Sequence, residues 1–307
     1  MDFELAIIGA GPAGYSAAIY AERAGIKTIV FDKNGGGGLA SIAPNIENYA
    51  GFKSITGADL LEKMKAHASD YAEMKLYEEI TDIKKNEHGF TLLTAEDKTY
   101  SVGAILFTTG TEHRKLTCEG ISKFEGKGVS YCATCDGFFF KNKNVGVVGG
   151  GNSALIEAIY LKQIGCKNVY LIHRRDQLRA EEAYEEDAEK AGVEFLLDTE
   201  VEKLSGDDLL SKVTLKNKKT GKSKEIDMDG LFISIGVVPQ NELAKKIGVK
   251  IDDHGYIVVD NQMRTNVKGI YAAGDITGGL RQVITAAAEG AIAALTSTEA
   301  LGKQYPY

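Results

Sequence analysis

Residues 4–14 read ELAIIGAGPAG, a short apolar run that ends in a cluster of glycines. The run itself has the length and apolar character of a buried strand, and the stretch after it, to about Ala24, has those of a helix. The turn between them follows the G-x-G-x-x-G pattern of dinucleotide-binding units, where small residues permit a tight turn, close approach of a pyrophosphate and close helix–strand packing. The residues of this pattern are Gly9, Gly11, Pro12, Ala13 and Gly14.

A second apolar run, Lys27–Phe31, ends at Asp32 and completes a strand–helix–strand unit. The N-terminus of the helix would present unpaired N–H groups to phosphates. A carboxylate at the end of the second strand accepts hydrogen bonds from free ribose hydroxyls and would repel a 2′-phosphate. Asp32 therefore indicates FAD or NAD rather than NADP at this first unit.

The same pattern returns in the middle of the chain. Asn144–Val148 is a predicted strand, Ser153–Ile164 a helix and Asn168–Ile172 a second strand. The glycine pattern here is the G-x-G-x-x-A variant, which begins at Gly149 and includes Gly151, Asn152 and Ser153.

No acid ends the second strand of this unit. His173, Arg174 and Arg175 follow it, and Arg179 is expected one helical turn further on. Guanidinium groups bind a phosphate through two parallel hydrogen bonds, so this cluster favours the 2′-phosphate of NADPH. The alternative is a solvated basic patch beside Glu181 and Glu182.

Cys132-Ala133-Thr134-Cys135 lies just before the second glycine pattern. A C-x-x-C near such a unit is typical of a redox-active dithiol, and a zinc site would need two further ligands that no nearby pattern supplies. Thioredoxin active sites usually have a Trp before the first Cys, and this chain has no Trp. Asp136 is a candidate proton donor for thiol–disulfide exchange, or alternatively a turn residue that caps backbone N–H groups. Cys118 and Cys166 are interpreted as ordinary thiols.

The net charge of −7 argues against a nucleic-acid partner, which a protein binds by neutralising phosphates. No apolar run reaches the roughly 20 residues that a membrane span needs, and the chain shows no signal peptide. We therefore expect a soluble cytoplasmic protein without a membrane partner, in a compartment that keeps bulk thiols reduced.

In combination and order, these patterns resemble the low-molecular-weight thioredoxin reductases, and so do Glu47-Asn48 and Ala273-Gly274-Asp275 with Arg281-Gln282. The resemblance covers essentially the whole chain. It implies FAD as the first cofactor, NADPH as the second, and thioredoxin or a thioredoxin-like protein as the disulfide substrate. It further implies a homodimer, and that Cys135 makes the charge-transfer contact with the flavin.

Residue by residue, the resemblance places FAD on the first glycine loop and on segments elsewhere in the chain. The expected FAD-site residues beyond those of the first loop are Asp32, Lys33, Gly38, Leu39, Asn48, Thr109, Gly110, Gly274, Asp275, Arg281 and Gln282. The expected NADPH-site residues are Gly151, Asn152, Ser153, His173, Arg174, Arg175 and Arg179, and no metal site is expected. By the same resemblance Asp275 holds the ribityl chain.

We therefore predict the α/β class with two Rossmann-like dinucleotide-binding domains, each a three-layer sheet with helices. The NADPH-binding domain, residues 113–241, is inserted into the FAD-binding domain, residues 1–112 and 242–307. The two crossings, near Thr111–Lys115 and Pro239–Leu243, would form a hinge about which the inserted domain rotates between two half-reactions.

Four positions depart from the usual family pattern. Gly37-Gly38-Leu39 lacks a Gln, and Tyr49-Ala50-Gly51 replaces Trp-Pro-Gly; both changes are expected to alter the flavin environment. Leu178 replaces an aromatic residue, and Gln240 stands where Asn is common. Three alternatives to an NADPH-dependent thioredoxin reductase are the same fold with a deazaflavin or ferredoxin donor, a ferredoxin–NADP reductase, and a flavin-binding redox sensor without turnover.

Overall fold

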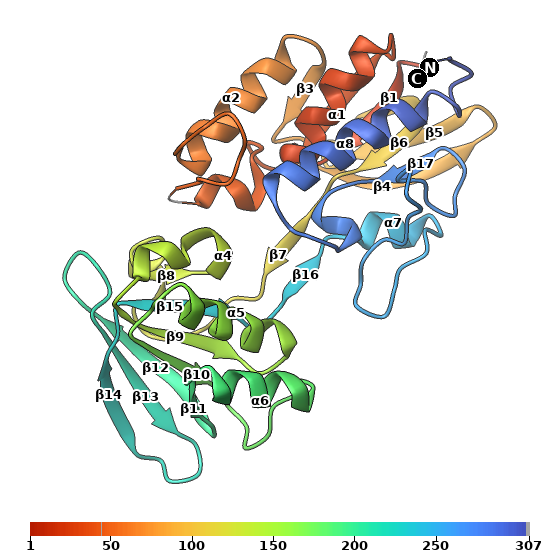
Figure 1. Cartoon of the computed structure of the whole chain (residues 1–307). Coiled ribbons are helices and arrows are strands. Elements are labelled where there is room, and N and C mark those ends of the chain that lie inside the picture. Colours follow the sequence, from red (N-terminus) through yellow and green to blue (C-terminus); the bar gives the residue numbers. More distant parts are fainter. Residues whose placement is uncertain (44, 305–307) are drawn as a thin grey trace. The chain divides into compact units, whose positions relative to one another are not determined.

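The chain crosses twice between two structural units (Figure 1). The computed structural model describes residues 1–43 and 45–304. One unit consists of Met1–Glu112 together with the chain from Val238 onward, and the other consists of His113–Val237. The crossings are the short strands β7 (Thr111–His113) and β16 (Val237–Pro239), which pair with each other in a two-stranded sheet. The second unit is therefore an insertion within the first.

The first unit contains a seven-stranded sheet with the order β3-β2-β1-β6-β5-β4, and β17 also pairs with β6. The parallel part joins β1 to its neighbours on both sides, and the hairpin β4–β5 is antiparallel. The strands are β1 (Phe3–Ile8), β2 (Thr28–Asp32), β3 (Glu73–Leu76), β4 (Ile80–Asn86), β5 (Gly89–Thr94), β6 (Thr99–Phe107) and β17 (Ile270–Ala272).

One strand prediction in this sheet was wrong. The sequence pattern around Gly103 predicts two strands, Thr99–Val102 and Ala104–Thr108, but the structure has the single strand β6. Its first half pairs with β5 and its second half pairs with β17, while β1 lies along most of its length. Three partners hold the chain extended through Gly103, which local sequence alone marks as a break.

Helices α1 (Pro12–Arg23) and α8 (Val283–Ser297) pack together in the first unit. Gly290 makes this possible, because a Cβ there would lie 2.1 Å from the carbonyl oxygen of Ala13. Alanines buried on both helices join the core beneath them. The remaining helical segments of this unit are η1 (Gly38–Ile42), α2 (Gly57–Ser69), α7 (Glu242–Lys246) and η3 (Asp275–Thr277). The first turn of α1, next to the glycine loop, is thereby fixed by the late part of the chain.

The second unit has a parallel sheet with the order β11-β10-β9-β15-β8, flanked by a three-stranded antiparallel sheet, β12-β13-β14. The strands are β8 (Val129–Ser130), β9 (Asn144–Gly149), β10 (Asn168–Ile172), β11 (Glu194–Leu196), β12 (Thr199–Ser205), β13 (Lys212–Asn217), β14 (Ser223–Asp227) and β15 (Gly230–Ser234). The helical segments are α3 (Ile121–Phe124), α4 (Ala133–Asp136), η2 (Gly137–Phe140), α5 (Asn152–Gln163) and α6 (Glu182–Lys190).

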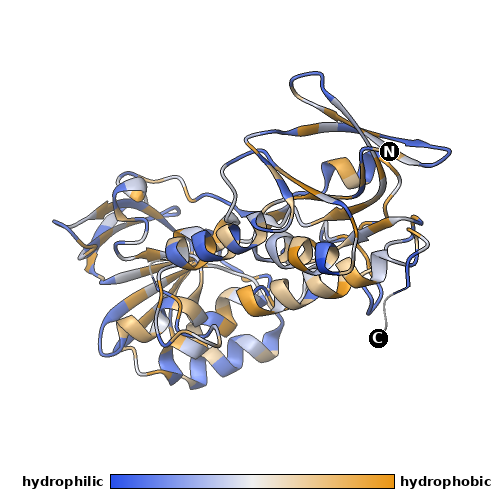
Figure 2. Cartoon of the chain, turned by 90° about the horizontal axis from the view of Figure 1, so that it is seen from above, coloured by the Kyte–Doolittle hydropathy of each residue, from blue (hydrophilic) through white to orange (hydrophobic). Residues whose placement is uncertain are grey.

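Hydrophobic residues concentrate on the sheet strands and the inner faces of the helices (Figure 2). The predicted α/β class with two Rossmann-like units is confirmed, since each unit has a β-α-β element at its parallel sheet. Among the described residues, none of the helices has the length and apolar character that crossing a membrane requires.

Candidate active site: two glycine loops and a disulfide

The glycines of the first loop are needed for two different reasons. A Cβ on Gly9 would lie 2.3 Å from the carbonyl oxygen of Thr108, and one on Gly14 would lie 2.0 Å from that of Gly9. Packing alone therefore requires these two glycines. Gly11 has φ −97°, which any residue can adopt, and a Cβ there would meet no atom within 4 Å. The free space in front of Gly11, at the N-terminus of α1, fits a bound pyrophosphate.

Asp32 holds the first loop in shape. Its Oδ2 accepts a hydrogen bond from the Ala10 N–H at 2.8 Å, and its Oδ1 accepts one from the Asn34 N–H at 2.7 Å. Each carboxylate oxygen has a second lone pair, so both can still accept from a ribose hydroxyl. The next residue, Lys33, forms an exposed ion pair with Glu112 at 3.2 Å.

The late segment around Gly274 and Asp275 lies beside the first turn of α1, because a Cβ on Gly274 would be 3.0 Å from the Ala13 Cβ. Glu289 of α8 fixes this segment: its Oε2 accepts a hydrogen bond from the Gly274 N–H at 2.7 Å. Burial raises the pKa of Asp275, while Arg281 lowers it and Glu289 raises it. Asp275 therefore offers a hydrogen-bonding carboxyl next to the glycine loop.

Sequence reasoning missed Glu289. The signal was present, because Glu289 is the one acid in the small-residue stretch ITAAAEGAIAAL, residues 284–295. An acid in an otherwise apolar helical face that packs on a core usually has a specific polar partner.

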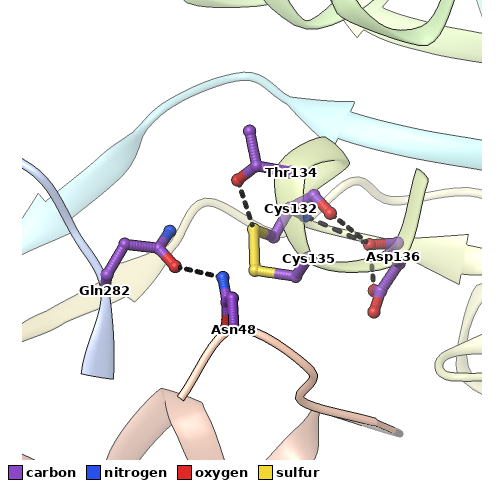
Figure 3. Close-up of a disulfide and its surroundings, with 7 residues drawn as sticks. Asn48, Cys132, Thr134, Cys135, Asp136 and Gln282 are labelled. Carbon is purple, nitrogen blue, oxygen red and sulfur yellow. Dashed lines mark hydrogen bonds between the residues drawn. A yellow bond between two sulfur atoms is a disulfide. The ribbon is translucent and has the colours of Figure 1, made fainter. Parts of the chain in front are cut away.

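The other expected FAD-site residues of the first unit fall in turns and at helix ends. The Asn48 amide donates a hydrogen bond to Gln282 Oε1 at 2.9 Å, which joins two segments distant in sequence (Figure 3). Thr109 donates its hydroxyl to the Gln240 carbonyl at 2.7 Å, and Gly110 accepts from the Gln240 N–H at 3.0 Å. Gly38 and Leu39 begin the 3₁₀ helix η1, and Arg281 is exposed.

Like the first glycine loop, the second has one glycine that packing requires and one that faces free space. A Cβ on Gly149 would lie 2.5 Å from the carbonyl oxygen of Ser234, whereas one on Gly151 would meet nothing within 4 Å at an ordinary φ of −113°. Gly151, at the N-terminus of α5, thus corresponds to Gly11 and leaves room for a second pyrophosphate.

Sequence reasoning did not single out Gly150, where the neighbouring His173 ring leaves no room for a side chain. A Cβ on Gly150 would lie 2.2 Å from His173 Nδ1. The His173 ring is buried, and its Nδ1 is 2.9 Å from the Gly149 carbonyl oxygen. Burial lowers the pKa of His173, which favours the neutral ring. His173 is therefore a buried side chain that packs against the glycine loop, whereas the three arginines grouped with it in the sequence analysis are exposed.

Arg174, Arg175 and Arg179 are exposed, and within residues 1–43 and 45–304 none of their guanidinium groups has a hydrogen bond or ion pair. Our expectation of a helical turn before Arg179 was wrong. The segment that carries the arginines is a loop, and α6 starts only at Glu182. The Arg179 N–H donates to the Gly150 carbonyl at 2.7 Å, so this contact ties the loop to the glycine turn.

Asn152 and Ser153 begin α5 directly after the glycines. The Asn152 amide makes a reciprocal pair of hydrogen bonds with Glu181: its Nδ2 donates to Glu181 Oε1 at 2.8 Å, and its Oδ1 accepts from the Glu181 N–H at 2.9 Å. Asn152 therefore fixes the far end of the arginine loop (residues 174–181) to the start of α5.

Cys132 and Cys135 form a disulfide with a Cα–Cα distance of 5.3 Å (Figure 3). Cys132 is the N-cap of the short helix α4, and its carbonyl accepts hydrogen bonds from the N–H groups of Cys135 and Asp136 at 3.3 and 3.1 Å. The Thr134 hydroxyl lies 3.4 Å from Cys132 Sγ. The two other cysteines are free, and burial raises the pKa of both Cys118 and Cys166 to about 11, which makes them poor thiolates.

The Asp136 carboxyl is buried next to the disulfide. Its Oδ2 accepts a hydrogen bond from the Ser130 hydroxyl at 2.5 Å, while its Oδ1 has no partner among the described residues. Burial raises the pKa of Asp136, although the Ser130 hydrogen bond lowers it. The side chain caps no backbone N–H group, so the alternative role as a cap is absent here. A carboxyl that keeps its proton at higher pH suits a proton donor.

Ser130 was also missed by sequence reasoning. Its Oγ accepts a hydrogen bond from the Cys132 N–H at 3.1 Å and donates to Asp136, so it connects the turn of the disulfide to the carboxyl. A polar residue two positions before the first Cys, in the buried strand β8, was the available signal.

We expect Asp136→Asn to raise the free energy of unfolding of the inserted unit at neutral pH. Because burial raises the folded-state pKa of Asp136, the unfolded state releases this proton at lower pH than the folded state does. Wild-type stability therefore falls as the pH rises from about 4 through the folded-state pKa, and the neutral amide avoids this loss. Urea unfolding across this pH range measures the difference.

The two proteins should be equally stable at pH values below about 4, where both states of the wild type are protonated. Asp208→Asn, an exposed position in the same unit, is the matched control and should change little. A variant that is less stable than the wild type at neutral pH would contradict the raised pKa.

Comparison with known proteins shows the family of this chain. The family model for pyridine nucleotide-disulphide oxidoreductases matches residues 3–290. The chain is 42% identical over 296 residues to the thioredoxin reductase of Listeria monocytogenes, which covers 95% of this chain and 91% of that protein. It is 43% identical over 296 residues to the thioredoxin reductase of Treponema pallidum, with 95% of each covered. The crystal structure of thioredoxin reductase from Streptococcus pyogenes matches with a TM-score of 0.92 at 36% identity, over 98% of each chain. The resemblance that the sequence predicted is thus confirmed, and the chain belongs to the pyridine nucleotide-disulphide oxidoreductase family.

Proposed function

We propose that this protein is a flavin-containing thioredoxin-disulfide reductase that takes its electrons from NADPH and passes them through the Cys132–Cys135 pair. One observation carries the proposal: a single chain combines two glycine loops, each with a glycine that packing does not require, and a C-x-x-C disulfide between them in sequence. This combination provides sites for two nucleotide cofactors and one dithiol.

The first unit has the groups that FAD needs. Gly11 and the N-terminus of α1 would bind the pyrophosphate, Asp32 the ribose, and Asp275 the ribityl chain. Bound flavin would supply two-electron transfer between a nicotinamide and a disulfide. The protein's own part is to orient the cofactor and hold it beside the carboxyl of Asp275.

The second unit has the groups that NADPH needs. Gly151 and the N-terminus of α5, with Asn152 and Ser153, would bind the pyrophosphate. The unpaired guanidinium groups of the arginine loop would bind the 2′-phosphate, which NADH lacks. The absence of an acid at the end of β10 removes the group that would repel this phosphate.

The dithiol would reduce its partner by thiol–disulfide exchange. A thiolate of the reduced pair attacks one sulfur of the partner's disulfide, and the departing partner sulfur takes a proton. The second thiol then loses its proton and attacks the mixed disulfide, which restores Cys132–Cys135 and releases the second partner sulfur as a thiolate. The reduced partner becomes a dithiol when this thiolate takes a proton from water. Asp136 would donate and then accept the single proton that these two steps exchange.

Two phenylalanines next to the disulfide favour a protein as the substrate. Phe138 and Phe139 of η2 are 65% and 42% exposed, directly after α4. An exposed apolar patch beside a reactive centre is typical of a protein-binding surface. We propose thioredoxin or a thioredoxin-like protein as the partner, in the cytoplasm, where such thiols stay reduced.

We expect anaerobic NADPH to bleach the flavin absorbance rapidly and NADH to bleach it slowly, because only NADPH presents a 2′-phosphate to the arginines. Stopped-flow absorbance measures both rates. Cys132→Ser should still bleach with NADPH yet fail to reduce thioredoxin. Absence of bleaching with either nucleotide would overturn NADPH as the donor and favour a deazaflavin or ferredoxin donor.

Gly11→Ala should lower the flavin content of the purified protein by at least about tenfold, because a methyl group would fill the space in front of the loop. The ratio of flavin to protein absorbance measures this. Since that Cβ would meet no protein atom within 4 Å, the flavin-free variant should unfold at the same urea concentration as flavin-free wild type. Full flavin content in the variant would show that the cofactor lies elsewhere.

We also propose that the protein is a homodimer. Ile284, Ala288 and Ile292 recur every four residues on α8 and form an exposed apolar stripe, in which the two isoleucines are 45% and 41% exposed. Self-association through a two-fold axis would bury such a stripe against its own copy.

In light scattering after size exclusion, wild type should have the mass of two chains, and Ile284→Glu/Ile292→Glu the mass of one. Tyr77→Glu, at an exposed position elsewhere in the first unit, should stay dimeric. A monomeric wild type would refute the dimer, and a dimeric double variant would place the interface on another surface.

A further inference from the structure

A hairpin turn brings an additional lysine to the arginine loop, here defined as residues 174–181. The turn joins β13 to β14, and the Lys218 N–H donates to the Asp198 carbonyl at 2.7 Å. The Asp198 N–H in turn donates to the Arg175 carbonyl at 2.9 Å. These two backbone hydrogen bonds attach the tip of the hairpin to the arginine loop.

Lys219, at the tip of this turn, binds two carboxylates at once. Its Nζ lies 2.9 Å from Asp198 Oδ2 and 3.1 Å from Asp176 Oδ2. Asp176 belongs to the arginine loop itself, immediately after Arg175 and three residues before Arg179. A lysine from a distant part of the chain therefore neutralises an acid that lies among the arginines.

The loop contains two acids, and both have partners other than the arginines. Asp176 is paired with Lys219, and Glu181 accepts a hydrogen bond from the Asn152 amide at 2.8 Å. The consequence is visible in the described part of the chain, where all three guanidinium groups of the loop lack a carboxylate partner. The loop keeps its acids and still presents its cations unpaired.

Without Lys219, the Asp176 carboxylate would compete with a bound phosphate for the guanidinium groups beside it. The hydrogen bond from Lys219 is the main cause that holds the pKa of Asp176 below its usual range, so this acid is charged at neutral pH. The Asp176–Lys219 pair is exposed, with 64% and 60% of the side-chain surfaces accessible, and exposed pairs are individually weak. Asp198 is only 19% exposed, and the three groups form a network, which strengthens the arrangement.

We propose that Lys219 is a specificity-determining residue for the 2′-phosphate of the nucleotide: by holding Asp176, it leaves the arginines of the loop free for that phosphate. The inference rests on the proposed NADPH site. It adds a residue that lies outside the glycine and arginine patterns and whose ammonium group, among the described residues, pairs with Asp176 and Asp198.

The test measures binding of 2′,5′-ADP and 5′-AMP to the flavin-loaded protein by calorimetry at low ionic strength. These probes differ only in the 2′-phosphate. We expect Lys219→Ala to weaken 2′,5′-ADP about two- to fivefold, the effect of an exposed ion pair, and to leave 5′-AMP unchanged. Lys218→Ala is the matched control, because it removes the same charge from the same turn but breaks a pair with Glu200 at 2.9 Å. It should leave both affinities within about twofold, since that pair is not part of the arginine loop.

A second substitution separates an indirect role from direct contact with phosphate. Asp176→Asn alone should change little, because Lys219 already neutralises this acid, whereas Asp176→Asn in the Lys219→Ala background should restore 2′,5′-ADP binding. A double variant that binds as weakly as Lys219→Ala would overturn the proposal and indicate that Lys219 touches the phosphate itself. Equal effects of Lys219→Ala and Lys218→Ala would also overturn it.

The wild-type result separates this proposal from the one on which it rests. If wild type binds 2′,5′-ADP no better than 5′-AMP, the NADPH site fails and Lys219 falls with it. Suppose instead that wild type prefers 2′,5′-ADP, that Arg175→Ala abolishes this preference and that Lys219→Ala leaves it unchanged. The NADPH site then stands, and only the role of Lys219 is rejected.

Discussion

The close approach of backbone to backbone at the two glycine turns is the constraint on which the rest of the structure depends. At Gly9 the neighbour is the end of β6, and at Gly149 it is the end of β15; in each case a single added methyl group would lie within 2.5 Å of a carbonyl oxygen. Because these contacts leave no room for a side chain, each helix starts directly at the end of the central strands. The open faces of Gly11 and Gly151 follow from that geometry, and they make the same scaffold usable for two nucleotides.

The carboxyl groups near these turns differ in their hydrogen bonding and in their burial. Asp32 ties one loop with two backbone hydrogen bonds, and Glu289 ties the segment of Asp275 with another. The two acids at the proposed reaction centres, Asp136 and Asp275, are instead partly or wholly removed from water, and burial is the first cause of their raised pKa values. Asp32 and Glu289 thus accept hydrogen bonds from backbone N–H groups, whereas Asp136 keeps one oxygen without a partner among the described residues.

The strand–glycine–helix elements could be predicted from the sequence because their signals are local. The strand Asn168–Ile172 was placed at its correct limits, and the C-x-x-C pair forms the expected disulfide. Most of the misses share a different cause: they depend on a partner distant in sequence. The continuity of β6 comes from three neighbouring strands, and the burial of His173 comes from Gly150 above it. The partners of Glu289 and Lys219 are likewise brought next to them by the fold, whereas the partners of Ser130 lie within six residues of it, where a local signal was available.

The paired strands β7 and β16 also bear on the architecture of the chain as a whole. The hydrogen bonds from Gln240 N–H to Gly110 and from Arg114 N–H to Gly236 hold the two ends of the inserted unit next to each other. For the host unit, an insertion of this kind is a long loop whose ends are already closed. The entropic cost of closing a loop grows only with the logarithm of the loop length. An insertion of more than a hundred residues therefore lowers the stability of the host unit only slightly more than a short connection would. An entire second nucleotide-binding unit can thus be carried between two adjacent points of the first without unfolding it.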